Sequence, residues 1–196
     1  MRRTLLAEEI SLSSPELEAK MREYAKRHRL KFNVKGQLGE GTDGTVWATS
    51  RNSVIKVIQR EKTFEVERRC YMRLHERRVS DVDGLAVPRI IEYSRDLQII
   101  EMTLVHPPFL LDFGKAYIDE PSPYTPEQLN EWYRQWRQYF PKEDIPRVHK
   151  VLGILKGYGI EYVDPKPWNI RFHVKEPAAD EVLDDPDDSY EPYEYE

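Results

Sequence analysis

The stretch Gly39-Glu40-Gly41-Thr42-Asp43-Gly44-Thr45-Val46 reads G-x-G-x-x-G-x-V and decides the fold of this 196-residue chain. Glycine at these three positions lets backbone N–H groups close over an anionic group without a Cβ in the way. A dinucleotide-binding fold would need a helix directly after the glycines. Residues 45–50 are instead rich in β-branched side chains, which favours a strand.

A second strand is predicted at residues 53–58, after a short turn at Arg51-Asn52. It reads Ser53-Val54-Ile55-Lys56-Val57-Ile58 and carries one lysine among aliphatic residues. A lysine inside an apolar strand is costly unless a carboxylate meets it. The next helix is therefore expected to supply a glutamate.

That helix is predicted at residues 63–74. On a period of 3.6 residues, Glu67 shares one face with Phe64 and Leu74. Glu65 points about 160° away from Glu67 by the same geometry. We predict that Glu67 pairs with Lys56, with Glu65 as the alternative.

A third motif, Asp164-Pro165-Lys166-Pro167-Trp168-Asn169-Ile170, lies farther along the chain. Its acid can accept a proton from a hydroxyl, and the lysine two residues later can contact a phosphate. The amide oxygen at the sixth position can hold Mg²⁺. Acid, lysine and amide at these offsets are what phosphoryl transfer from MgATP requires of one loop.

In this order, the glycine motif, the strand lysine, the helix glutamate and the acid-containing loop resemble the protein-kinase family, in a minimal or atypical, bacterial-type form. The resemblance covers roughly residues 31–186. It implies an α+β, two-lobed protein-kinase-like fold that binds ATP and Mg²⁺ in the cleft between the lobes. The implied domains are an N-terminal helical extension (1–30), a nucleotide-binding N-lobe with a small antiparallel sheet (31–102), a reduced, mainly helical C-lobe (103–186) and an acidic disordered tail (187–196).

The resemblance also implies roles for single residues. Lys56, held by Glu67, would orient the α- and β-phosphates. Asp164 would orient and deprotonate the acceptor hydroxyl, and Lys166 would neutralise charge on the transferring group. Ile100 would be the gatekeeper residue, and the backbone of Glu101 to Thr103 the hinge that binds adenine. The residues implied to contact ATP are Gly39, Gly41, Gly44, Val46, Val54, Lys56, Ile100, Glu101 and Thr103.

The metal site implied by the resemblance joins Asn169 to an acid from an Asp-Phe-Gly tripeptide that follows the loop. No such tripeptide follows Asn169, and Asp184 is the best substitute by position, with Asp185 next. Asp112-Phe113-Gly114 occurs about fifty residues before the loop, where a collinear kinase would place it away from the metal. We interpret it as a structural turn, which an unusual chain order would make a metal ligand instead.

Composition agrees with an intracellular globular protein. Hydrophobic residues make up 39% of the chain, no apolar run approaches the roughly 20 residues of a membrane span, and Cys70 is the only cysteine. We therefore expect a cytoplasmic protein without a membrane partner. Ten of the 35 acidic residues and no basic ones follow Lys175, so the rest of the chain is mildly basic. This balance gives little support for nucleic-acid binding.

The acidic tail allows two interpretations: a solvated disordered end, or a segment that folds back onto the basic cleft and competes with nucleotide. Helices are also predicted from Ser14 to about Arg29, over 126–140 and over 146–158. The second carries Trp132, Trp136 and Phe140 at i, i+4 and i+8, an aromatic stripe typical of a core or of a protein-partner surface.

The function implied by the resemblance is a phosphotransferase that moves the γ-phosphoryl group of ATP to a hydroxyl acceptor, either a protein Ser/Thr or a small molecule. The alternative is a pseudokinase that senses nucleotide or acts as a scaffold, since the metal acid is uncertain and the large lobe is short. A third interpretation is an interaction protein whose motifs are coincidental. The sequence does not identify the acceptor.

Overall fold

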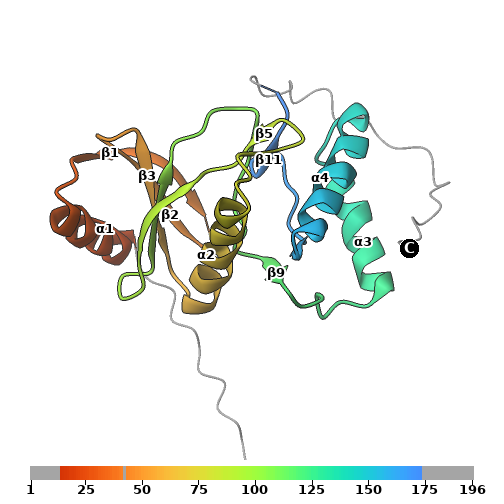
Figure 1. Ribbon diagram of the computed structural model, residues 1–196, viewed down its shortest axis with the longest axis horizontal. Coiled ribbons are helices and arrows are strands. Elements are labelled where there is room, and N and C mark those ends of the chain that lie inside the picture. The colour runs from red at the N-terminus through yellow and green to blue at the C-terminus, as the bar shows by residue number, and fades with distance from the viewer. Residues whose placement is uncertain (1–13, 42, 174–196) are drawn as a thin grey trace, which may run out of the picture. The chain divides into compact units, whose positions relative to one another are not determined.

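The computed structural model describes residues 14–41 and 43–173. Within these residues the fold is α+β, with four α-helices, an antiparallel five-stranded sheet and two smaller sheets. Contacts divide the chain into two compact units (Figure 1). The first comprises Met1–Arg69 and Arg89–Leu104, and the second Cys70–Pro88 and Val105–Glu196.

The first unit contains the five-stranded sheet, in the order β1-β2-β3-β7-β6. All neighbouring strands are antiparallel, and every residue of the central strand β3 is buried. Because β3 is covered on both faces, its residues on either side of Lys56 are aliphatic. The strands are β1 (Phe32–Gly41), β2 (Gly44–Thr49), β3 (Ser53–Ile58), β6 (Ile90–Ser94) and β7 (Ile99–Thr103).

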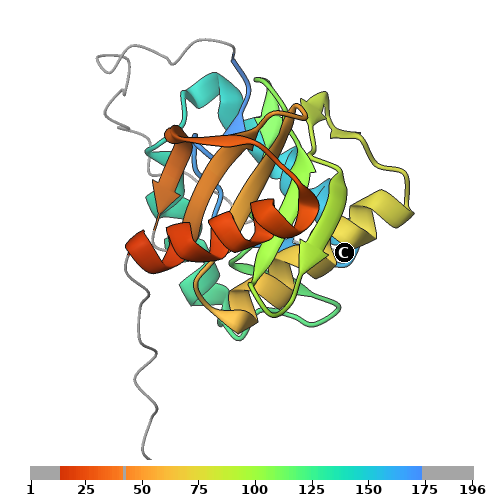
Figure 2. The same ribbon diagram turned by 90° about the vertical axis from the view of Figure 1, so that its left-hand side faces the viewer.

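Helix α1 (Ser14–His28) crosses one face of this sheet (Figure 2). Its inner residues and the sheet form one hydrophobic core, because apolar side chains recur on a single face of the helix. The core consists of Leu17, Met21, Tyr24, Ala25, Leu30, Trp47, Ile55, Val57 and Ile99.

Helix α2 (Glu61–Glu76) follows β3 directly. Phe64 and Glu67 are buried within the first unit, whereas Cys70, Tyr71 and Leu74 are buried residues of the stretch that groups with the second unit. Phe64 and Glu67 are predicted to share one face of the helix, and both are buried in the structure, which agrees with that prediction.

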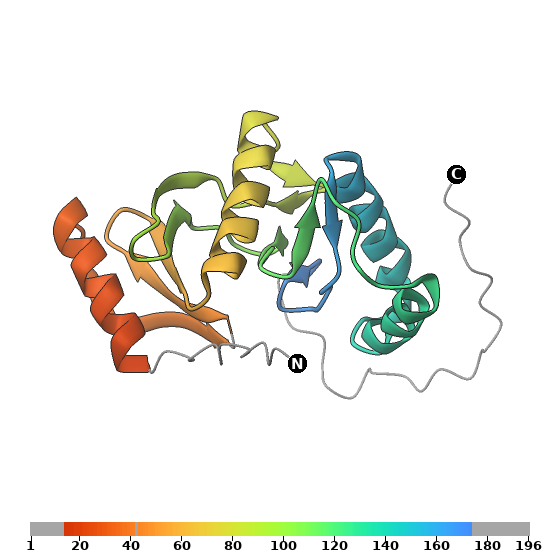
Figure 3. The ribbon, with the colours of Figure 1, turned by 90° about the horizontal axis from the view of Figure 1, so that it is seen from below.

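The second unit contains helices α3 (Pro126–Arg137) and α4 (Ile145–Gly157), which lie side by side (Figures 1 and 3). The ring centroids of Trp136 and His149 are 5.4 Å apart, so Trp136 of the aromatic stripe packs on α4, whereas Trp132 stacks on Tyr124. Thr125 begins α3 with a capping box that it forms with Gln128. The short 3₁₀ helix η1 (Lys142–Asp144) joins the two helices.

Two small sheets complete the second unit. One has the strand order β11-β8-β5-β4, in which only β5 and β8 are parallel, and the other pairs β10 with β9. Their strands are β4 (Asp81–Val82), β5 (Leu85–Ala86), β8 (Phe109–Leu110), β9 (Ala116–Ile118), β10 (Ile160–Tyr162) and β11 (Ile170–Arg171). Among the described residues, no helix has both the length and the apolar character needed to cross a bilayer.

Candidate functional site

Lys56 and Glu67 form a buried ion pair in the first unit. The Lys56 ammonium lies 2.8 Å from each carboxylate oxygen of Glu67, and the exposed fractions of the two side chains are 10% and 0%. The predicted pairing is therefore confirmed. The alternative, Glu65, instead forms ion pairs with Arg68 and Arg95. Because both carboxylate oxygens lie at hydrogen-bond distance from the ammonium, the buried pair restricts the orientation of the lysine.

The three glycines of the G-x-G-x-x-G motif have different surroundings. Gly39 and Gly41 lie within β1, and a Cβ added at either would have no neighbour within 4 Å. At Gly44, where φ is +153°, an added Cβ would lie 2.0 Å from the carbonyl oxygen of Val57. Gly44 is thus required by the close approach of β3, while the other two glycines leave open backbone where a ligand can approach.

The predicted ATP-contacting residues of β2, β3 and β7 divide between the two faces of the sheet. Val46, Lys56 and Ile100 are direct cross-strand partners and share one face. Val54 lies two residues before Lys56 and shares that face.

Glu101 points to the opposite face, toward α1. Its buried carboxylate accepts hydrogen bonds from Ser53 Oγ at 2.6 Å and from the Tyr24 hydroxyl at 3.1 Å. Burial, and then the charge of Glu101, raises the pKa of Tyr24. The backbone N–H of Thr103 donates to the carbonyl of Arg89 at 2.9 Å. The Glu101 side chain is thus part of the α1 interface, and the Thr103 amide is part of the sheet.

The loop that contains Asp164 lies in the second unit and is held by its own hydrogen bonds. The N–H groups of Asn169 and Ile170 donate to the carbonyl of Lys166 at 2.8 and 2.7 Å. The side-chain nitrogen of Asn169 donates to the backbone carbonyl of Asp164 at 3.2 Å. Because the amide nitrogen donates in this way, the amide oxygen of Asn169 is the acceptor end of this side chain.

Two lysines contact the buried carboxylate of Asp164. Lys166 Nζ lies 3.0 Å from Oδ1, and Lys115 Nζ lies 3.2 Å from Oδ2. The Asp164 side chain is 9% exposed, against 29% for Lys166 and 44% for Lys115. The acid is therefore charge-compensated on both oxygens, and Lys115 is the more accessible partner.

The pairing of β11 with β8 brings Asp112-Phe113-Gly114 to this loop, contrary to our expectation from chain order. Strand β8 ends just before Leu111, and β11 begins just after Asn169. Ile170 pairs with Leu110, and the Leu111 N–H donates to the Asn169 carbonyl at 2.8 Å. Asp112 thus follows a residue that is hydrogen-bonded to Asn169, although Asp112 and Asn169 are 57 positions apart in sequence.

Tyr162 is a buried residue whose surroundings include both the Asp112 segment and the Asp164 loop. Its hydroxyl donates to the Leu111 carbonyl at 3.1 Å. Complete burial raises the pKa of Tyr162, the charges of Asp112 and Asp164 raise it further, and a hydrogen bond with Asn169 opposes them. Tyr162 therefore senses the charges of both carboxylates from a site that is hydrogen-bonded to the residue before Asp112.

The group formed by Asp112, Asp164 and Asn169 offers oxygen donors, the ligands that Mg²⁺ prefers. No cluster of three or more His, Cys, Asp or Glu side chains suited to a metal occurs among the described residues. Mg²⁺ is commonly held by one or two carboxylates together with substrate phosphates and water. The donor set at Asn169 therefore fits magnesium that arrives with a nucleotide.

Sequence reasoning missed Lys115 and Tyr162 as parts of this site and placed Asp112 outside it. No local pattern marks Lys115, whose role depends on a contact across 49 positions of sequence. The Asp-Phe-Gly tripeptide did mark Asp112 in the sequence, but as a metal ligand only for an unusual chain order. Asp184, Asp185 and the acidic tail lie outside the described residues.

Comparison of the sequence with models of known protein families and with curated proteins gives no match.

Proposed function

We propose that this protein is an ATP-dependent phosphotransferase with a two-lobed, protein-kinase-like fold and an altered chain order, which transfers the γ-phosphoryl group of ATP to a hydroxyl. The observation that carries the proposal is the pairing of β8 with β11, which places the segment that begins at Asp112 beside the loop that contains Asp164 and Asn169. Phosphoryl transfer needs two metal ligands and a proton acceptor. Asp112 and Asn169 have the side chains of such metal ligands, and Asp164 has that of a proton acceptor.

The first unit supports nucleotide binding. The Lys56–Glu67 pair presents an oriented ammonium, and Gly39 and Gly41 provide backbone that a phosphate can approach. Asp112 and Asn169 of the second unit would hold Mg²⁺, and Asp112 replaces Asp184 as the proposed acid. Bound Mg²⁺ would neutralise charge on the phosphates.

Asp164 acts on the acceptor. Each of its oxygens accepts from one lysine, and Lys115 is the more exposed of the two. A carboxylate oxygen can accept a second hydrogen bond, so an acceptor hydroxyl can donate to Oδ2 on the side of Lys115. The hydroxyl oxygen then forms a bond to the γ-phosphorus as the bond from that phosphorus to the bridging oxygen of ADP breaks. The hydroxyl proton passes to Asp164, and Lys166 offsets charge on the transferring group.

A second candidate function, nucleotide sensing by a pseudokinase, is favoured by the same two lysines. A carboxylate engaged on both oxygens can be a structural anchor rather than a proton acceptor. In that case MgATP raises the melting temperature of the protein, but no phosphate is transferred.

The test is the transfer or release of γ-labelled phosphate from MgATP by the purified chain. We expect Asp164→Asn and Asn169→Ala to lower turnover by about 100-fold or more. Glu143→Gln, an exposed acid of η1, is the control and keeps full turnover. Melting temperatures verify that each variant is folded. Equal turnover by the wild type and Asp164→Asn would sink the enzyme proposal.

A further inference from the structure

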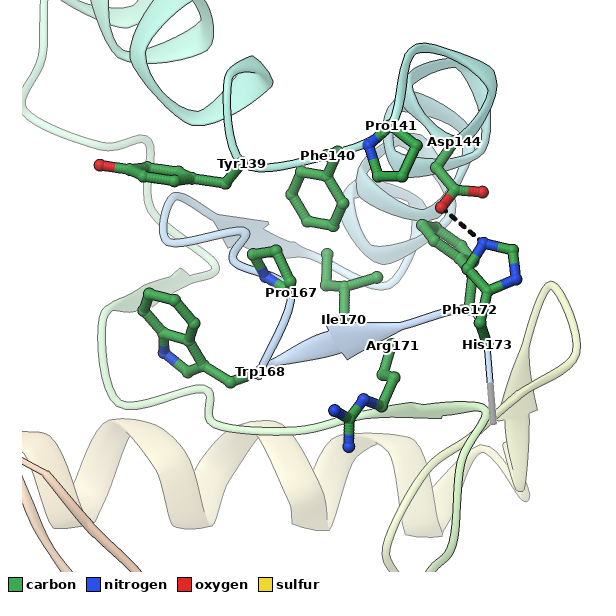
Figure 4. Close-up of a pocket in the computed structure, with 10 residues that line it drawn as sticks. All are labelled: Tyr139, Phe140, Pro141, Asp144, Pro167, Trp168, Ile170, Arg171, Phe172 and His173. Atoms are coloured by element: carbon green, nitrogen blue, oxygen red, sulfur yellow. Dashed lines mark hydrogen bonds and ion pairs between the residues drawn. The ribbon is translucent and has the colours of Figure 1, made fainter. Parts of the chain in front are cut away.

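A pocket of about 320 Å³ lies beside the Asp164 loop, within the second unit (Figure 4). Its walls come from the turn that follows α3, from η1, from the loop, and from β11 with the two residues after it. This volume is at the small end of ligand pockets, which span about 300–1,000 Å³. The lining residues are Tyr139, Phe140, Pro141, Asp144, Pro167, Trp168, Ile170, Arg171, Phe172 and His173.

Two aromatic rings at the mouth of this pocket are left to solvent. Trp168 is 61% exposed and Tyr139 is 46% exposed, and their ring centroids are 6.5 Å apart. Only two other large hydrophobic side chains among the described residues are as exposed, and both lie in the first unit. Adjacent exposed aromatic rings at a concave site indicate a binding surface.

The charges around the pocket favour an acidic occupant. The Lys166 ammonium lies 5.5 Å from the centre of the Trp168 ring, and the Arg147 guanidinium lies 4.5 Å from that of Phe172. Lys166 shares the acid Asp164 with Lys115, and Arg147 shares Asp83 with Lys150, so bases exceed acids in both groups. The one acid of the lining, Asp144, is bound by His173 at 2.8 Å, as Figure 4 shows. Figure 4 also shows the Arg171 side chain directed away from the aromatic wall, so we do not count it among these charges.

The chain supplies an occupant of this chemistry next to the pocket. His173 lines the pocket, and the following segment carries ten acids, no base after Lys175, and the tyrosines Tyr190, Tyr193 and Tyr195. Sixteen residues separate His173 from Tyr190, a link that can reach roughly 50 Å when extended. Tethering of this kind gives an effective concentration of about 1 mM or more, which favours it over a separate partner.

We propose that the aromatic pocket binds the acidic segment 184–196 of the same chain, with a tyrosine ring placed against Trp168 and Tyr139. Tyrosine suits this pocket because it provides a large rigid ring at a low cost in side-chain entropy. The neighbouring carboxylates lie near Lys166 and Arg147. This contact does not require that the protein binds ATP or transfers phosphate.

The test uses the full chain and the accessibility of Trp168 to acrylamide, taken as the difference between the wild type and Trp168→Leu. We expect the triple variant Tyr190→Ala, Tyr193→Ala, Tyr195→Ala to raise quenching of Trp168 about threefold toward the value of an exposed indole. Ser189→Ala, in the same segment, leaves the quenching unchanged. Tyr139→Ala raises it as the triple variant does, while Leu38→Ala, at an exposed apolar residue of the first unit, has no effect.

Equal quenching in the wild type and the triple variant overturns the proposal. Protection of Trp168 that disappears on dilution also overturns it, because the occupant is then a second copy of the chain. Protection that survives the triple variant at every dilution shows that the tyrosines are not the occupant. Replacement of the acids at 184–188 by their amides is expected to weaken protection, and no effect of this change would refute the role of charge.

Discussion

Lys56 and Glu67 illustrate how far a sequence argument reaches at the scale of a residue. A lysine in an apolar strand requires a buried partner, and helical periodicity selected Glu67 over Glu65. The observed distance of 2.8 Å to both oxygens agrees with that selection. The predicted turn at Asp112 is present, since the Gly114 N–H donates to the Asp112 carboxylate at 3.3 Å. The position of Asp112 beside the Asn169 segment could not be predicted, because its neighbours in sequence do not contain the partner strand.

Loss of either member of the Lys56–Glu67 pair is expected to destabilise the fold. Lys56→Met leaves a fully buried carboxylate without its cation and should lower the free energy of unfolding by about 3–5 kcal/mol. The double variant Lys56→Met, Glu67→Leu should recover most of this loss. Urea denaturation measures both variants, with Glu18→Gln, at an exposed ion pair, as a control that changes stability by about 1 kcal/mol or less. A free energy of unfolding of Lys56→Met equal to that of the wild type would contradict the claim that the buried Glu67 carboxylate needs this cation.

The three glycines make a second prediction at this scale. Gly44→Ala should lower the free energy of unfolding by about 1–3 kcal/mol, since its Cβ would overlap the Val57 carbonyl. Gly39→Ala and Gly41→Ala should leave stability almost unchanged and weaken MgATP binding. Thermal unfolding and calorimetric titration separate these effects. Unchanged MgATP affinity in both open-backbone variants would mean that these glycines do not approach the phosphates.

Whole elements were easier to predict than their connections. The helices at 14–28 and 145–157 and the strands β2 and β3 follow from caps, apolar periodicity and β-branched runs. The pairs β8–β11 and β9–β10 do not, because strands of two or three residues carry almost no pattern of their own. Their register is set by contacts between distant parts of the sequence.

The packing of α3 on α4 should make stability depend on pH. His149 lies among the rings of Tyr133 and Trp136, and burial, followed by the charge of Arg137, lowers its pKa. The unfolded chain then takes up a proton at higher pH than the folded chain does. Stability from this residue is therefore complete above its ordinary pKa of about 6.5 and is lost as the pH falls below it.

We expect the free energy of unfolding to decrease between pH 7 and pH 5.5 and the His149→Gln variant to show a flatter dependence. Denaturation curves at closely spaced pH values measure this difference. His75→Gln, at an exposed histidine of α2, serves as the control and should keep the wild-type slope. If the free energy of unfolding changes equally with pH in the wild type and in His149→Gln, His149 is not the source of the pH dependence.

At the scale of the whole molecule, chain order decides which residues form the site. Asp112 precedes Asn169 by more than fifty residues, yet the β8–β11 pair places its segment next to Asn169. A sequence argument that keeps the familiar order of motifs selects Asp184 instead. The topology therefore changes the identity of the proposed metal acid while the residue types stay the same.

The most direct test of the account is the Mg²⁺ dependence of ATP binding, measured by calorimetry for the wild type, Asp112→Asn and Asp184→Asn. If Asp112 and Asn169 hold Mg²⁺ with the nucleotide, the wild type and Asp184→Asn bind ATP more tightly with Mg²⁺ than with a chelator. Asp112→Asn then loses this difference. Loss of the Mg²⁺ effect in Asp184→Asn with its retention in Asp112→Asn, or the lack of any Mg²⁺ effect in the wild type, would contradict the account.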